Sequence, residues 1–137
     1  MLSGVPLRRS QNSAKPCKDL AVRAARLMGQ AERGEVVLFL PALVVAEVVW
    51  VLKSFYRHSL DDIARVVVPL LSADGLEVED RDVLIRALEL TREKNVDFVD
   101  AVLTLQAARQ DEPVCSFDAD FKRLPVQWVA PSRSVVV

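Results

Sequence analysis

The sequence predicts an α/β domain with three layers, in which helices flank both faces of a mostly parallel central sheet. Short apolar runs, suited to buried strands, alternate along the chain with longer segments in which apolar residues recur every three or four positions. In addition, the chain has 137 residues, and 51% of them are hydrophobic. This is enough to build one hydrophobic core, but the chain is too short for two ordinary domains. We therefore expect one domain whose sites lie at the carboxyl ends of the strands.

The composition argues against several kinds of site. The two cysteines, Cys17 and Cys115, lie far apart and fit small reduced side chains better than a disulfide framework. The single histidine, His58, leaves too few ligands for a structural zinc site and is the one imidazole available to a Ser-His-Asp arrangement. The net charge of -1 does not attract nucleic acid, so an RNA substrate needs a local basic face or a metal ion.

No segment reads as a membrane span or a secretory signal. The longest apolar stretches, residues 36–40 and 43–52, fall well short of the roughly 20 residues that cross a bilayer. The beginning of the chain carries arginine and lysine without the apolar stretch of a signal peptide. The expected location is the cytoplasm.

The first expected element is a helix. Residues 1–18 are rich in Ser, Pro, Asn and Arg and show no periodicity, so we expect an atypical, disordered arm there. From Asp19 onward apolar residues recur at helical intervals, and Gly34 supplies a left-handed end to the helix. The domain itself is therefore expected to span residues 19–137.

A strand and an unusually apolar helix come next. Residues 36–40 are all aliphatic or aromatic, as in a strand buried on both faces, and Pro41 can begin the next helix. That helix, residues 42–56, is apolar nearly all round, so we expect it to pack inside the domain or against a partner.

The later helices are marked by their caps. Ser59, with Asp62 three residues later, begins a helix that Pro69 is expected to kink or shorten. Asp80 begins another helix, and Asp97 caps the helix after it. Short strands are expected at residues 76–78, 114–116 and 126–129.

Glu47 is the most informative single residue, because its helix is otherwise apolar on all sides. Burying an unpaired carboxylate costs several kcal/mol or forces it to take up a proton, so we expect a cation to face it. Spacing alone leaves two interpretations equally open: a metal ion, or an arginine of a neighbouring helix.

Three aspartates complete the candidate site. Asp118 and Asp120 follow the strand at residues 114–116 and can converge on one hard cation, although aspartate is also an ordinary turn residue. Asp100 lies in the first turn of the helix that Asp97 caps, where acids also complement the helix dipole. Three or four carboxylates without histidine suit Mg²⁺ or Mn²⁺ and phosphodiester hydrolysis by a metal-bound water.

The acids stand in three segments that resemble the successive acidic motifs of PIN domains, in particular those of the VapC toxins of bacterial and archaeal toxin–antitoxin pairs. The segments are residues 40–52 with Glu47, residues 96–101 with Asp100, and residues 116–121 with Asp118 and Asp120. The resemblance runs from about Asp19 to Leu124, and the order and spacing of three motifs make it specific.

The resemblance implies a magnesium-dependent endoribonuclease of the VapC toxin type. In this family, acidic side chains bind one or two Mg²⁺ or Mn²⁺ ions that drive RNA cleavage. The resemblance assigns this role to four carboxylates: Glu47, Asp100, Asp118 and Asp120. Ser116 resembles the hydroxyl residue that orients the site. The family also implies a homodimer, and a cognate antitoxin whose C-terminal segment covers the acidic groove and blocks it with a basic side chain.

The sequence departs from the family at its beginning. PIN domains open with a buried strand that ends in Asp-Thr-Asn, and nothing in residues 1–18 resembles it. The loss of this carboxylate is expected to weaken metal binding. The loss of this strand is expected to leave the neighbouring strands of the sheet uncovered. We expect a different start or reading frame of the gene to explain the break. Translating the other frames upstream of Asp19 tests this, because one of them should encode an apolar strand ending in such a triplet.

Two other functions compete with the nuclease. A catalytically impaired PIN-like scaffold would still dimerise and bind an antitoxin or another protein through the apolar helix at residues 42–56. Metal titration and cleavage assays of Asp100→Asn and Glu47→Gln separate it from an enzyme. A receiver-like signalling domain also gathers acids around magnesium, but it needs an acidic pair after its first strand and a lysine after a late one, and the sequence shows neither.

Overall fold

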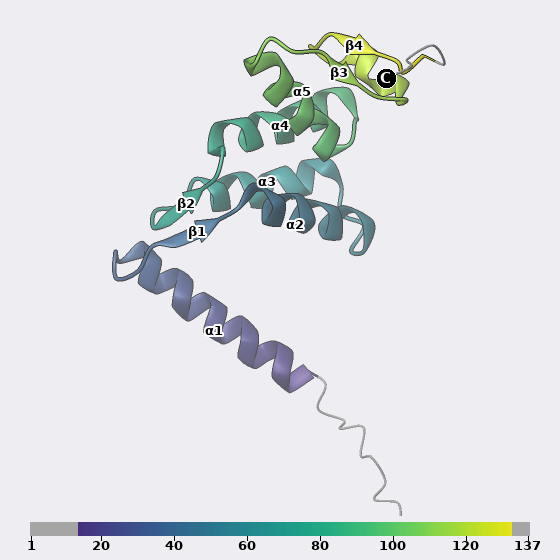
Figure 1. Cartoon of the computed structure of the whole chain (residues 1–137). Helices are drawn as coiled ribbons and strands as arrows, with labels where there is room; N and C mark the ends of the chain where they lie inside the picture. The colour runs from purple at the N-terminus through teal and green to yellow at the C-terminus, as the bar shows by residue number, and fades with distance from the viewer. Residues whose placement is uncertain (1–13, 133–137) are drawn as a thin grey trace, which may run out of the picture.

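The computed structural model of the chain describes residues 14–132. Its helices are α1 (Ala14–Glu32), α2 (Ala42–Ser54), α3 (Leu60–Leu71), α4 (Arg81–Lys94) and α5 (Phe98–Arg109), with a 3-10 helix η1 (Ala119–Arg123). Its strands are β1 (Leu38–Leu40), β2 (Leu76–Val78), β3 (Val114–Cys115) and β4 (Trp128–Val129). Helices α2 to α5 stack against one another, and α1 projects away from them (Figure 1). None of the described helices is long and apolar enough to cross a membrane.

Helix α1 begins earlier than the sequence pattern indicates. Residues 14–18, predicted as part of a disordered arm, form its first turn. Pro16 fits there because the N–H groups of a first turn have no helical acceptor, so a proline removes no hydrogen bond. The end is as predicted, since Gly34 follows the helix with a φ of 75°. Residues 1–13 of the predicted arm lie outside the described part of the chain.

Strands β1 and β2 pair in parallel, with Leu38 opposite Leu76 and Leu40 opposite Val78. The prediction that β1 is buried on both faces is wrong, because Phe39 is 62% exposed. Side chains alternate between the two faces of a strand, and the face that carries Leu40 is the one that packs against the core. The opposite face of this sheet is open.

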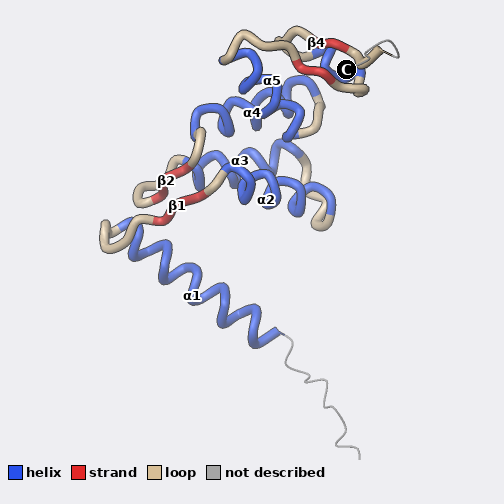
Figure 2. Tube along the Cα trace, viewed as in Figure 1, coloured by secondary structure: helices blue, strands red, loops and turns tan. Residues whose placement is uncertain are grey.

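The α/β class with parallel strand pairing is confirmed, but the pairing is divided between two small sheets. Strand β3 pairs with β4 in parallel, with Val114 opposite Trp128. Within residues 14–132 each sheet contains two strands, and no strand joins the two sheets. Figure 2 shows the two strand pairs at opposite ends of the helical stack. The predicted central sheet is therefore not continuous.

The core lies among helices α2 to α5, where α4 packs on both α3 and α5. Its largest fully buried aliphatic side chains are Ile63, Leu71, Leu84, Leu90, Val45, Val49 and Val67. Helix α2, predicted to pack inside the domain or against a partner, buries only the face with Val45 and Val49. Leu43 and Trp50, on its other face, are exposed.

The predicted caps are confirmed at two helices. Ser59 Oγ accepts a hydrogen bond from the N–H of Asp62 at 3.1 Å and begins α3. Asp97 Oδ1 accepts one from the N–H of Val99 at 2.9 Å and begins α5. Pro69 lies in the last turn of α3, close to where the helix ends, as expected for a residue that cannot continue the hydrogen-bond ladder.

Gly75 allows the end of α1 to approach the start of β2. It has a φ of 80°, and a Cβ there would lie 2.2 Å from the carbonyl oxygen of Ala31. Gly34 has a similar φ of 75° but open space around it, so Gly34→Ala should cost about 1–2 kcal/mol for the left-handed conformation alone. We expect Gly75→Ala to lower the free energy of unfolding by clearly more. Urea unfolding of the two variants measures the difference, and equal losses would contradict the close approach.

Candidate functional site

Helix α5 places Asp97 and Asp100 near each other at its N-terminus. Asp97 is the exposed cap, whereas Asp100 lies in the first turn and is half-buried. The helix is held in place by its inner face, on which Phe98, Ala101 and Thr104 are buried. Asp100 is therefore fixed at the margin of the core.

The loop after β3 carries Asp118 and Asp120. Ser116 Oγ accepts a hydrogen bond from the N–H of Asp118 at 3.1 Å, and Asp118 Oδ1 accepts one from the N–H of Asp120 at 2.9 Å. These bonds confirm that Asp118 acts as a turn residue, and they give Ser116 a part in shaping the loop. An ionised carboxylate has further lone pairs, so the turn leaves Asp118 able to accept other contacts.

Asp100 experiences the charges of its acidic neighbours. Partial burial raises the pKa of Asp100, and the negative charges of Asp97, Asp118 and Asp120 raise the pKa further. Helix α5 and the loop after β3 thus bring four carboxylates into one electrostatic environment. Each of these influences disfavours the charged form of Asp100, and a bound divalent cation would relieve all of them.

Two residues outside the predicted site hold this loop in place. Arg123 pairs with Asp120 at 3.1 Å and donates to the carbonyl oxygen of Lys94 at 2.7 Å, which joins η1 to the end of α4. Trp128 Nε1 donates to the carbonyl oxygen of Ser116 at 3.0 Å and joins β4 to the loop. The three-residue spacing of Asp120 and Arg123 could have indicated the first contact. Nothing local in the sequence indicates the contact between Trp128 and Ser116.

Glu47 differs from Asp100 in its surroundings. It is exposed on α2, two residues and hence about 200° around the helix axis from both Val45 and Val49, which are buried, so the chain itself does not bury its carboxylate. Its charge is not among those that raise the pKa of Asp100. It forms no ion pair with the described residues, so the arginine interpretation finds no support within them. Of the predicted acids, Asp118 and Asp120 are the ones whose charges act on Asp100.

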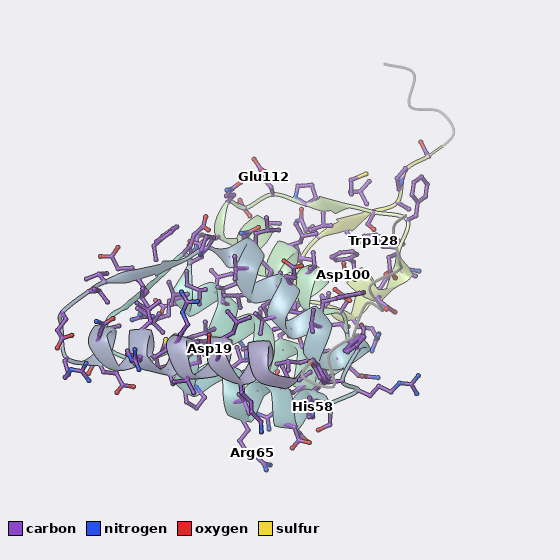
Figure 3. All side chains as sticks on the ribbon, turned by 90° about the horizontal axis from the view of Figure 1, so that it is seen from below. Asp19, His58, Arg65, Asp100, Glu112 and Trp128 are labelled. Carbon is purple, nitrogen blue, oxygen red and sulfur yellow. The ribbon has the colours of Figure 1, made fainter. Side chains whose placement is uncertain are left out.

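The acids offer oxygen ligands, which are the kind that Mg²⁺ and Mn²⁺ prefer, but their spacing does not complete a site. Among the described residues, no group of three or more Asp, Glu, His or Cys side chains is arranged to hold a metal ion. His58 lies away from Asp100 in Figure 3 and adds no ligand to this cluster. In donor chemistry the residues fit the predicted metal, and the carboxylates would have to move closer together to coordinate one ion.

The hydroxyl of Ser116 should stabilise the loop that carries the aspartates. Ser116→Ala removes the acceptor of the Asp118 N–H and is expected to lower the free energy of unfolding by about 1 kcal/mol. The matched control is Ser54→Ala, at an exposed position in α2 whose side chain makes no hydrogen bond with the described residues. Thermal unfolding compares the stability of the two variants. If Ser116→Ala loses no more stability than Ser54→Ala, water replaces the hydrogen bond between Ser116 and Asp118.

Comparison with known proteins places the chain in a family. The PIN domain model matches residues 18–127. A VapC ribonuclease from Aquifex aeolicus (strain VF5) is 29% identical over 102 residues, which make up 74% of this chain and 75% of that protein. No solved structure matches the chain significantly. Because the family model covers most of the chain and all the acidic residues described above, this chain belongs to the PIN domain family.

Proposed function

We propose that this chain is a metal-dependent endoribonuclease of the VapC type, which cleaves the phosphodiester bonds of RNA. The observation that carries the proposal is the gathering of Asp100, Asp118 and Asp120 where α5 begins and β3 ends. A half-buried acid whose pKa is raised by neighbouring acids is typical of a functional site. Membership of the PIN domain family and similarity to a VapC ribonuclease support the same class of reaction.

The proposed cofactor is Mg²⁺ or Mn²⁺. Asp100, Asp118 and Asp120 would hold the ion, and Glu47 is the proposed fourth carboxylate. A divalent cation at this cluster would supply positive charge and polarise a phosphoryl oxygen. Because Glu47 lies on the open face of α2, we expect its contribution to depend on what covers that face.

The proposed partners are an RNA substrate, a second copy of the chain and a cognate antitoxin. Exposed apolar side chains on α2, among them Leu43 and Trp50, support contact with protein partners. The acidic cluster is complementary to a basic side chain of the kind that an antitoxin would insert. The proposed location, consistent with these partners, is the cytoplasm.

The test is cleavage of labelled RNA by the purified full chain, with Mg²⁺ or Mn²⁺ and with EDTA. Cleavage that needs the metal and disappears in Asp100→Asn supports the proposal. Cleavage that survives both EDTA and the substitution would come from a contaminating nuclease or another site, and would reject it.

A catalytically impaired scaffold is the second candidate, because no described group of three or more possible ligands is arranged to hold a metal ion. This candidate predicts no cleavage with any metal but retained binding of a protein partner. Calorimetric titration with Mn²⁺ separates the two. Binding heat that Asp100→Asn removes supports the enzyme, and the absence of binding heat supports the scaffold.

A further inference from the structure

Helix α1 and the β1–β2 sheet each expose an apolar surface. Leu20 and Leu27, seven residues apart on one side of α1, are 60% and 42% exposed. On the open face of the sheet, Phe39 is 62% exposed, and Val37, just before β1, is 63% exposed. In Figure 1, α1 runs away from the other helices, so neither surface covers the other. Apolar surfaces of this kind mark interaction sites.

The end of α1 is fixed, so the helix cannot turn back to cover its own sheet. The N–H groups of Gly34 and Glu35 donate to the carbonyl oxygens of Ala31 and Gln30 at 3.0 and 2.9 Å, which closes the last turn. Ala31 is 1% exposed, and its backbone lies so close to Gly75 that a Cβ there would be 2.2 Å away. Rotating α1 onto the sheet would break this contact. Another molecule is therefore needed to cover both surfaces.

The charges beside the two surfaces are of opposite sign. Arg23 and Arg26 lie on α1 close to its exposed leucines. Glu77 is the register partner of Phe39 and is exposed beside it on the sheet. None of these three charged side chains forms an ion pair within the described chain. Arg81 also lines the hollow beside Phe39, but Glu77 and Asp82 leave that hollow net negative. An apolar helix surface bordered by arginines thus matches an apolar sheet surface of net negative charge.

We propose that two copies of this chain exchange helix α1, so that the helix of each copy covers the open face of the β1–β2 sheet of the other. One two-fold axis relates the two contacts, because each chain supplies both surfaces. Symmetry makes the contact twice and so doubles the area that one helix buries on one sheet, and a specific interface typically buries about 1,200–2,000 Å² in total. The exchange deepens the homodimer proposed above by naming its surface, and it requires neither RNA nor metal.

Sedimentation equilibrium of the full chain in EDTA, without RNA, tests the exchange. We expect a dimer whose dissociation constant rises at least tenfold in Leu20→Asp and in Phe39→Asp. Val66→Asp, at a 64% exposed position on α3, is the control and should leave the constant unchanged. Circular dichroism shows whether each variant is folded, and Leu20 lies outside the core, so its variant should remain folded. A monomer at all concentrations, or a dimer that neither aspartate weakens, overturns the proposal.

Charge reversal distinguishes exchange between chains from contact within one chain. Arg23→Glu and Glu77→Arg should each weaken the dimer severalfold, because each places like charges at both contacts. Mixing these two variants should restore the affinity. In the mixed dimer one contact joins the two altered side chains and the other joins the two unaltered ones, so opposite charges meet at both. Recovery only when both changes are in the same chain would indicate contact within one chain and overturn the exchange. Because no cleavage is measured, failure here leaves the nuclease proposal intact.

Discussion

Asp100→Asn is expected to abolish metal-dependent RNA cleavage, with a loss on the order of 100-fold or more in kcat/KM. Asparagine keeps the size of the side chain and its place in the first turn of α5, but it removes the charge that would bind a cation. The pKa of Asp100 is raised by burial and then by the charges of Asp97, Asp118 and Asp120, so Asp100 lies within the field of all three. Initial rates on labelled RNA at saturating Mn²⁺ measure the effect.

Two further variants make this result specific. Asp74→Asn changes an exposed aspartate outside the cluster and should leave the rate unchanged. Glu47→Gln should lower the rate by less than Asp100→Asn, because Glu47 is exposed on α2, whereas Asp100 is half-buried beside other acids. If Asp100→Asn cleaves RNA as fast as the unaltered chain, the acidic cluster is not the active site and the proposed nuclease mechanism fails.

Features that depend on a few neighbouring residues could be predicted from the sequence. Ser59 and Asp97 cap helices because a short polar side chain reaches an N–H two or three residues later, whatever the rest of the chain does. The same holds for Asp118, whose carboxylate bonds the N–H of Asp120. The aspartates come together because α5 begins where Asp97 indicated, and because β3 ends within one residue of the predicted position.

Features that depend on what lies alongside a segment could not be predicted. The apolar residues around Phe39 and Glu47 indicated burial, but burial requires a neighbouring element, and the described chain supplies none on those faces. Pattern alone cannot distinguish a surface covered within the chain from one that is left for a partner. The early start of α1 could not be predicted for a different reason: residues 14–18 show no helical periodicity of apolar residues, although a proline such as Pro16 fits the first turn of a helix.

The raised pKa of Asp100 should make the stability of the metal-free fold depend on pH. Below the pKa of an unfolded aspartate, about 3.9, both states are protonated and Asp100 has no effect. As the pH rises from there through the raised pKa of the folded state, the folded chain holds the proton more tightly, so stability falls. Asp100→Asn stays neutral throughout. In EDTA at pH 7 it is therefore expected to unfold at a higher temperature than the unaltered chain, and near pH 3 the difference should vanish.

Adding a divalent cation should reverse the order at pH 7. Mn²⁺ at 100 times its dissociation constant would stabilise the unaltered fold by about 2.7 kcal/mol, and Asp100→Asn should gain less. Thermal unfolding with Mn²⁺ and with EDTA gives both comparisons, with Asp74→Asn expected to follow the unaltered chain in each. An Asp100→Asn variant that is the less stable chain even in EDTA would contradict the raised pKa of Asp100, and with it the burial and repulsion that cause it. A reversal would connect the repulsion to the metal site, because a cation bound at Asp100 turns the mutual repulsion of these carboxylates into shared attraction.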